Sequence, residues 1–328
     1  MYWTKSKGTG GAVLKEEDFV VDEIPSGKFF VKYSRSGGGV KVIKGPYTLA
    51  LLKKKGMTTK DAIKFIQRKF NLKKDEIGYA GLKDKFAVTS QYITLRGEIK
   101  EINEEKIKLA KIGYTDKMMQ VGELIGNRFA INLRNCDNAK NVTAIINEIK
   151  KRAMPNYFGR QRFGSHGDNH EVGRLILRHE YEKALELVNK RGSNKKNLEE
   201  ISKKALKFFI HAYQSFLFNK VLDAYVSKYS KPCFEEFPLV GYDTKLKNDF
   251  ASEQIKKVLE KDKINIKDFS IRWLSIRCNG SSRNAFVNVD ELSCKTEGNS
   301  IDLIFTLPKG SYATTLLREI TKTTPQAL

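Results

Sequence analysis

Cysteine and histidine are both scarce in this chain of 328 residues, which has four of each. The cysteines, Cys136, Cys233, Cys278 and Cys294, lie far apart and form no C-x-x-C pair. Structural zinc sites and disulfide frameworks need cysteines at characteristic spacings. The sequence therefore predicts neither kind of site, and a few dispersed thiols are typical of a protein in a reducing cytoplasm.

Long apolar runs and several familiar motifs are also missing. No stretch approaches the roughly 18 apolar residues of a membrane-spanning helix, and Met1 to Gly8 lack the apolar core of a signal peptide. The P-loop, GxGxxG, HExxH and GxSxG motifs do not occur. These absences argue against nucleotide hydrolysis, zinc proteolysis and α/β-hydrolase chemistry.

Negative charge is scarce relative to positive charge. The chain has 60 Lys and Arg against 38 Asp and Glu, a formal net charge of +22. An excess of one sign this large repels itself unless an anionic partner binds, which favours nucleic acid. A merely solvated surface, or the charge enrichment of a heat-adapted protein, is the alternative.

Apolar periodicity predicts an α+β architecture. Alternating and β-branched residues indicate strands over 19–24, 29–33, 77–80, 90–95, 128–134, 271–277, 285–289 and 303–307. Apolar residues at helical spacing indicate helices from about Thr59, over 142–153, through much of 171–230 and over 312–321. The Thr59 hydroxyl is expected to cap the first of these helices. We expect one mainly antiparallel sheet interrupted by a basic helical segment. The length suits two domains or one large one.

Asp84 is the first candidate for chemistry. It follows Gly81 and lies between Lys83 and Lys85, on the loop between two expected strands. Neighbouring cations favour the ionised carboxylate, which can act as a nucleophile, a general base or a metal ligand. An aspartate that bonds its own turn is the alternative, and on residue chemistry alone it is the commoner role.

The segment from Asn156 to Gly164, NYFGRQRFG, concentrates aromatic, guanidinium and amide side chains. Tyr157 and Phe158 offer rings for stacking, and Arg160 and Arg162 offer contacts to phosphate. A pocket for a flipped-out base needs these groups together with an amide that reads the base edge. A helix-to-strand loop with ordinary core aromatics explains the same residues equally well.

A third candidate segment lies near the C-terminus. Ser311 is expected to cap a helix, whose free backbone N–H groups can hold a phosphate or a carboxylate. Arg318 falls on the last part of that helix. Packing of Leu316 and Leu317 into the core is a compatible second role for the same segment.

Several segments, taken in this order, resemble the TruD family of tRNA pseudouridine synthases. They cover residues 17–21, 80–91, 126–129, 156–164, 212–219, 238–241 and 307–314. The likeness runs from about residue 12 to the C-terminus, and the segments around Asp84 and Phe158 are highly specific. The lysine-rich composition of a compact chain favours an archaeal member.

The resemblance implies roles for particular residues. Asp84 is expected to be the catalytic nucleophile, Phe158 to stack on the target uracil, and Asn156 to hydrogen-bond in the same pocket. Bacterial members carry a lysine a few residues before the block that corresponds to Glu17-Asp18-Phe19, and this lysine lies close to the catalytic aspartate. When the residues are counted back without gaps, its position in this chain is Val13, and Lys15 follows two residues later. The candidates for a cationic partner or an RNA contact are Lys15, Lys83, Lys85, Gln91, Arg160, Arg162 and Arg318.

The resemblance also implies a fold and a partner. We expect the pseudouridine-synthase fold over 1–170 and 296–328, interrupted by an inserted α/β domain over 171–295. The implied activity is isomerisation of uridine to pseudouridine in tRNA, at position 13, without cofactor or metal, by a protein that is favoured to be a monomer. Two alternatives stay open: a noncatalytic RNA-binding or chaperone protein on the same fold, and a metal-dependent nuclease using Asp84 with Asp18 or Asp22.

Overall fold

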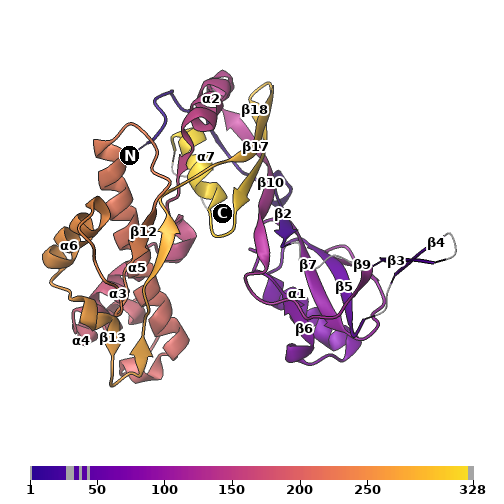
Figure 1. The fold of residues 1–328 in the computed structure, drawn as a ribbon, viewed down its shortest axis with the longest axis horizontal. Helices are drawn as coiled ribbons and strands as arrows, with labels where there is room; N and C mark the ends of the chain where they lie inside the picture. Colours follow the sequence, from indigo (N-terminus) through magenta and orange to yellow (C-terminus); the bar gives the residue numbers. More distant parts are fainter. Residues whose placement is uncertain (1, 27–32, 37–38, 43–44, 324–328) are drawn as a thin grey trace. The chain divides into compact units, whose positions relative to one another are not determined.

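The computed structural model describes residues 2–26, 33–36, 39–42 and 45–323, coloured along the chain in Figure 1. The chain forms two compact units. The sheet unit comprises Lys5–Lys150, Val289–Ala313 and Leu317–Leu328, and the helical unit comprises Met1–Thr4, Lys151–Asn288 and Thr314–Leu316. The expected domain limits after residue 170 and before residue 296 stay a prediction.

A ten-stranded sheet forms the sheet unit. Its main path runs in the order β17 (Asp290–Glu297), β18 (Ser300–Pro308), β10 (Leu124–Cys136), β2 (Phe19–Pro25), β7 (Val88–Arg96), β5 (Tyr47–Lys54), β9 (Ile107–Thr115) and β8 (Ile102–Asn103). β1 (Gly10–Ala12) pairs with β10, and β6 (Ile77–Tyr79) pairs with β7. β2 and β7 are parallel, and the other described pairs of this sheet are antiparallel. The expected α+β fold with a mixed, mainly antiparallel sheet is confirmed.

Most strands lie where the apolar alternation predicts them. In the expected strand over 29–33, residues 29–32 lie outside the described residues, and Tyr33 begins β3 (Tyr33–Ser36), which pairs with β4 (Gly39–Val42). Strand β17 was not predicted because most of its side chains are exposed, which leaves no apolar alternation to detect.

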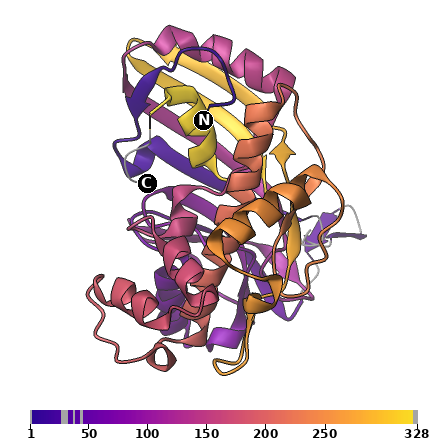
Figure 2. The ribbon, with the colours of Figure 1, turned by 90° about the vertical axis from the view of Figure 1, so that its left-hand side faces the viewer.

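One half of the sheet is covered by two helices on the same face. Phe129, Ile131 and Leu133 of β10 alternate inward, and the ring of Phe129 stacks on that of Phe305 in β18 with centroids 5.1 Å apart. Helices α2 (Val142–Arg152) and α7 (Ala313–Thr321) lie over these strands (Figures 1 and 2). The expected cap at Ser311 is wrong, because Tyr312 occupies the N-cap position and makes no side-chain capping bond.

Helix α1 (Thr59–Phe70) covers the other half of the sheet. Its apolar stripe, with Ile63 and Ile66, packs against Leu52 of β5 and Ile93 of β7 in one cluster. The helix begins where predicted, but Thr58 caps it by accepting a hydrogen bond from the backbone N–H of Asp61. The Thr59 hydroxyl is thereby left for another role.

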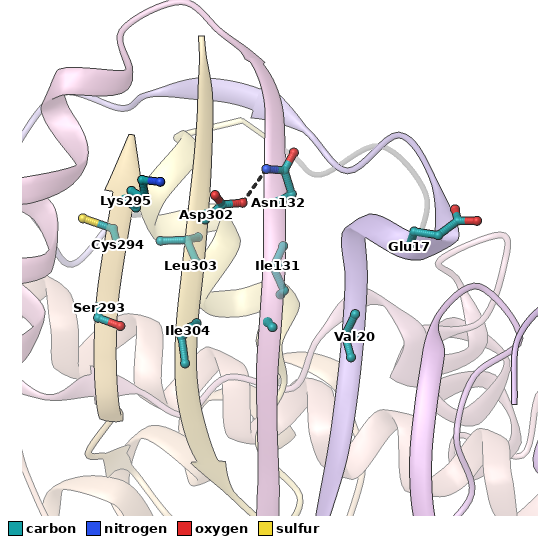
Figure 3. Close-up of a pocket in the computed structure, with 11 residues that line it drawn as sticks. Glu17, Val20, Ile131, Asn132, Ser293, Cys294, Lys295, Asp302, Leu303 and Ile304 are labelled. Atoms are coloured by element: carbon teal, nitrogen blue, oxygen red, sulfur yellow. Dashed lines mark hydrogen bonds between the residues drawn. The ribbon is translucent and has the colours of Figure 1, made fainter. Parts of the chain in front are cut away.

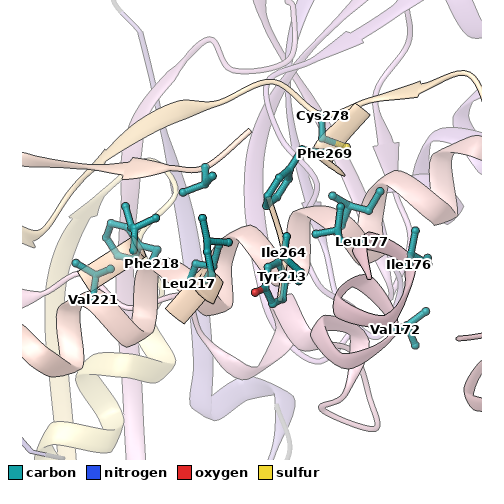
Figure 4. Packing of buried hydrophobic residues seen from close by; sticks show 14 of the residues in the cluster. Val172, Ile176, Leu177, Tyr213, Leu217, Phe218, Val221, Ile264, Phe269 and Cys278 are labelled. Atoms are coloured by element: carbon teal, nitrogen blue, oxygen red, sulfur yellow. The ribbon is translucent and has the colours of Figure 1, made fainter. Parts of the chain in front are cut away.

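The helical unit surrounds α5 (Lys203–Lys228), whose many buried residues need neighbours on several sides. Helices α3 (Asn169–Leu177), α4 (Tyr181–Asn189) and α6 (Phe250–Asp262) supply part of one large apolar cluster, shown in Figure 4. Short strand pairs complete the unit: β11 (Met154–Pro155) with β16 (Phe286–Val287), β12 (Glu236–Leu239) with β15 (Ser281–Asn284), and β13 (Ser270–Ile271) with β14 (Ile276–Arg277). The helical segment expected over 171–230 is confirmed, whereas the strand expected over 271–277 is this last tight pair.

The longest helix of the described residues, α5, carries lysines along its length. Among the described residues, no helix is both long enough and apolar enough to cross a bilayer.

Candidate active site

Asp84 lies on the loop between β6 and β7, as predicted. The antiparallel pairing of these strands fixes both ends of the loop, with Ile77 opposite Leu95 and Tyr79 opposite Ile93. Asp84 is exposed on this loop. An exposed carboxylate on a loop held by a sheet is accessible to a ligand and fixed in place by the strands beneath it.

Two buried polar side chains hold the backbone just before Asp84. The backbone N–H of Lys83 donates to the Thr59 hydroxyl at 2.8 Å, and that hydroxyl donates to the Gln91 amide oxygen at 2.9 Å. The Gln91 amide nitrogen donates to the backbone oxygen of Gly81 at 3.1 Å. Gln91 is fully buried and Thr59 is 1% exposed. Gln91 was a candidate for an RNA contact. Its side chain is fully buried and bonded within the protein, which does not fit that role.

Lys54, the last residue of β5, holds the loop at Asp84 itself. Its ammonium group donates to the backbone oxygen of Asp84 at 2.8 Å and to that of Met57 at 2.7 Å. The side chain is 1% exposed. Burial lowers the pKa of Lys54 to about 8, and the negative charge of Asp84 opposes that fall. Lys54 is therefore a buried cation placed directly behind the candidate nucleophile.

The lysines named in the sequence lie in different surroundings. The Lys83 ammonium is 2.8 Å from the carboxylate of Glu23 and donates to the Asn127 side chain at 2.6 Å, so it is committed to a buried ion pair. Burial raises the pKa of the Glu23 carboxyl, and the positive charge of Lys83 partly counteracts this rise. Lys85 and Lys15 are exposed. The assignment of Lys15 as a partner of Asp84 stays a prediction.

Asp18, one of the carboxylates in the nuclease alternative, is held by an arginine. The Arg134 guanidinium donates to both of its carboxylate oxygens at 2.6–3.0 Å, and this bonding lowers the pKa of Asp18. In the described part of the chain, no group of three His, Cys, Asp or Glu side chains is arranged to hold a metal ion.

Asn156, in the helical unit, is bonded at both ends of its amide. Its nitrogen donates to the backbone oxygen of Asn284 at 3.0 Å, and its oxygen accepts from the Arg283 guanidinium at 2.7 Å. Arg283 also donates to the Asn156 backbone oxygen at 2.9 Å. The side chain of Asn156 is only 4% exposed. In this structure the residue braces the segment that carries Phe158.

Phe158 is half-buried and its backbone is fixed by Asn219 of α5. The Asn219 amide accepts from the Phe158 N–H at 2.9 Å and donates to the Phe158 backbone oxygen at 3.0 Å. The guanidinium carbon of Arg283 lies 4.2 Å from the centroid of the Phe158 ring, and that of Arg162 lies 5.7 Å away. Cations at these distances are attracted to the ring face.

The predicted site residues fall into two sets, each described within its own unit. Asp84, Lys83, Lys85, Lys15, Gln91 and Arg318 belong to the sheet unit, and Asn156, Phe158, Arg160 and Arg162 belong to the helical unit. Within each unit, residues far apart in sequence meet these candidates, as the Lys54 ammonium meets the Asp84 backbone oxygen. Arg160 is exposed and Arg318 is half-buried.

Sequence reasoning missed Lys54, Thr59 and Arg283. A signal for Lys54 was present, since Ala50, Leu52 and Lys54 follow each other at the period of two that points side chains to one face of a strand, and all three are buried. No comparable signal marks Arg283, whose partners Asn156 and Phe158 precede it by more than 120 residues.

A pocket of about 480 Å³ lies on the sheet itself, across β17, β18, β10 and β2 (Figure 3). At its edge the Asn132 amide donates to the Asp302 carboxylate at 2.5 Å. None of the predicted site residues is among those that line it.

Comparison with known proteins gives consistent matches. The family model described as "tRNA pseudouridine synthase D (TruD)" matches residues 1–188 and 228–320. A protein of Aquifex aeolicus named "tRNA pseudouridine synthase D" is 33% identical, with 84% of this chain and 92% of the relative covered. An Archaeoglobus fulgidus protein named "Probable tRNA pseudouridine synthase D" is 27% identical, with 98% and 97% covered.

A solved crystal structure from Methanosarcina mazei, whose description names tRNA pseudouridine synthase D (TruD), superposes with a TM-score of 0.76. The match covers 99% of this chain and 96% of that chain at 23% identity. At this level of identity the match establishes a shared fold.

Proposed function

The chain belongs to the tRNA pseudouridine synthase D (TruD) family, and we propose that it isomerises uridine to pseudouridine in tRNA, at position 13, with Asp84 as the nucleophile. The tRNA partner agrees with the net charge of +22. We assign the chemistry to the domain formed by residues 1–170 and 296–328, and a supporting role to the inserted residues 171–295.

One observation carries the assignment of Asp84. Its side chain is exposed, while Lys54, Thr59 and Gln91 hold the loop backbone from below through three hydrogen bonds of 2.8–3.1 Å, and a fourth bond joins Thr59 to Gln91. Ordinary turn aspartates need no such support from buried polar side chains. Fixing a reactive group in advance lowers the entropy cost of reaching the transition state, and supporting hydrogen bonds are how proteins achieve it.

The reaction explains what the remaining residues must do. The N1–C1′ bond breaks, the uracil turns over, a C5–C1′ bond forms, C5 loses its proton and N1 gains one. The reaction is therefore an isomerisation with no net change in atoms. Asp84 can form a bond to C1′ or C6, or remove a proton from the sugar. Lys54 acts as a positioning residue that fixes the Asp84 backbone and places a positive charge near its carboxylate.

The base-binding part of the proposal rests on Phe158. A target uridine must leave its stack to be turned over, and an aromatic ring can replace the lost stacking. Arg283 and Asn156 brace this ring and its backbone. Because its amide is bonded at both ends, Asn156 contacts the base only if Arg283 or Asn284 releases it. Lys15, Lys85, Arg160, Arg162 and Arg318 remain candidates for RNA contacts.

Replacement of the Asp84 carboxylate tests the proposal. Asp84→Asn, which keeps the size of the side chain, should reduce pseudouridine formation in a transcribed tRNA below detection and leave tRNA binding within about threefold. Asp75→Asn is the matched control, because Asp75 is an exposed acidic residue of the same unit. Sequencing of bulk RNA after carbodiimide labelling, with and without the protein, identifies the target uridine.

Four outcomes separate the alternatives. Turnover by Asp84→Asn would remove Asp84 from the nucleophile role. A wild-type protein that binds tRNA but forms no pseudouridine would point to the noncatalytic RNA-binding protein. Loss of activity with a chelator would favour a metal-dependent enzyme. Pseudouridine at another site would retain the activity and overturn position 13.

A further inference from the structure

A second pocket, in the helical unit, lies at the start of α5 and has a volume of about 730 Å³. Its lining comes from the first turns of the helix and from the turn between β13 and β14. The lining residues are Ser202, Lys203, Lys204, Ala205, Lys207, Phe208, His211 and Ser275. Nothing in the proposed reaction uses this pocket.

The pocket is positively charged without compensation. Three of its lining residues are lysines, no carboxylate lines it, and none of the ion pairs among the described residues involves Lys203, Lys204 or Lys207. Burial lowers the pKa of His211, and the charges of Arg162 and Lys207 lower it further, so its ring is expected to be neutral near pH 7. Clustered like charges of this kind are relieved by an anionic ligand.

Phe208 gives the pocket a flat apolar surface. Its side chain is 40% exposed, although a large ring on a helix next to a core is normally turned inward. An exposed aromatic ring beside unpaired lysines provides both a stacking surface and charges for phosphate, the combination that proteins use for single-stranded nucleic acid.

Arg162 connects this pocket to the proposed base platform. Its guanidinium carbon lies 5.8 Å from the centroid of the Phe208 ring and 5.7 Å from that of Phe158. The guanidinium is anchored by donating to the Ser215 hydroxyl at 2.9 Å and to the His211 backbone oxygen at 3.5 Å. The two rings therefore lie less than 12 Å apart, which about two nucleotides of an unstacked strand can bridge.

We propose that this pocket binds the RNA strand beside the target uridine, with one base stacked on Phe208 and phosphates bound by Lys203, Lys204 and Lys207. This inference rests on the proposed function, because it assumes that the target base reaches Phe158. Arg162 lies between the two stacked bases and holds the phosphate that joins them. The pocket thus fixes the strand on one side of the flipped nucleotide, which the flipping reaction needs.

Charge reversal and ring removal test the pocket. The first variant is Lys203→Glu, Lys204→Glu, Lys207→Glu, and the second is Phe208→Ala. The control is Lys256→Glu, Lys257→Glu, Lys261→Glu, which makes the same charge change on exposed residues of α6 in the same unit. The probe is a transcribed tRNA, the readout is Kd over a range of salt concentrations, and thermal melting checks the fold.

The pocket variants should weaken binding more than the control. Loss of three phosphate contacts should reduce the slope of log K against log salt by about 2. Phe208→Ala should raise Kd roughly tenfold to a hundredfold with little change in the salt slope. A pocket variant with the wild-type Kd and slope, or a control with an equal loss, would overturn the inference.

An assay of pseudouridine formation with the same proteins separates this inference from the proposed function. If the wild-type protein forms pseudouridine and the pocket variants bind and react normally, the proposed function stands. The RNA-binding role of the pocket is then refuted. A wild-type protein that forms none removes the proposed function, whatever the pocket variants do to tRNA binding.

Discussion

Replacement of Lys54 by methionine is the sharpest test of how the Asp84 loop is held. Methionine is similar in length and apolar, so it can occupy the same fully buried space. The substitution removes the ammonium group that donates to the backbone oxygens of Asp84 and Met57. Nothing else in the loop network changes, because Thr59 and Gln91 keep their own bonds.

Two opposing effects determine the stability of Lys54→Met. Each carbonyl oxygen that loses its donor costs about 1–3 kcal/mol. Against this, the wild-type protein bears the cost of burying a charge. The fall of the Lys54 pKa from 10.5 to about 8 corresponds to about 3 kcal/mol between the protonated and neutral forms. The loss at two carbonyl oxygens and the relief of the buried charge largely cancel, so the free energy of unfolding should change by less than about 3 kcal/mol.

The activity of Lys54→Met should fall far more than its stability. The Asp84 backbone loses its nearest donor, and a displacement of about 1 Å in a reactive group can cost about a hundredfold in rate. The favourable interaction of the ammonium with the Asp84 carboxylate is lost as well. We expect kcat near pH 7 to fall by about a hundredfold with KM for tRNA little changed.

The pH dependence of the wild-type protein separates positioning from folding. Since the pKa of Lys54 is lower in the folded chain than in the unfolded chain, the unfolded chain holds more protons between about pH 8 and 10.5. This group therefore makes the protein more stable as pH rises through that window. Activity should fall in the same window, because the ammonium loses its charge.

Single-turnover release of tritium from tRNA labelled at C5 of uridine measures this directly. The wild-type rate should decline above about pH 8, and Lys54→Met should lack that decline because it has no group to titrate there. Titration of the uracil itself affects both proteins equally and cancels in the comparison. A Lys54→Met protein with the wild-type rate and the same alkaline decline would refute the positioning role.

Two further substitutions probe the site on either unit. Thr59→Val keeps the shape of the side chain but removes the hydroxyl that joins Lys83 to Gln91. We expect denaturant titration to show a loss of about 1–3 kcal/mol in the free energy of unfolding. Single-turnover rates should show a larger proportional loss of kcat. Phe158→Ala should reduce turnover by roughly tenfold or more while the protein melts normally, since stacking is worth about 1–3 kcal/mol per base. Unchanged turnover would show that the target base stacks elsewhere.

Much of the fold was predictable because its signals are local. The alternation in 128–134 and the helical spacing in 142–153 correspond to β10 and α2 within a few residues. Strand β17 escaped prediction because its exposed side chains carry no apolar alternation, and it forms by pairing with β18. The cap at Ser311 was misplaced by one residue, within the usual uncertainty of a helix end.

The candidate site was predictable only in part. The loop position of Asp84 follows from the two strands around it. Gln91 and Asn156 were read as groups that face a ligand, yet both are buried and bonded within the protein. A polar side chain in a sequence motif can serve either purpose, and its burial decides between them.

By itself, the sequence determined the positive charge and the ordered segments that place the chain in its family. Charge and motif order are properties of the chain that folding does not alter. Only the tertiary structure put Lys54 behind Asp84 and Arg283 over Phe158, because packing joins residues separated by 30 and by more than 120 positions. The sequence names the candidate reactive groups, and the contacts between distant segments decide how firmly each is held.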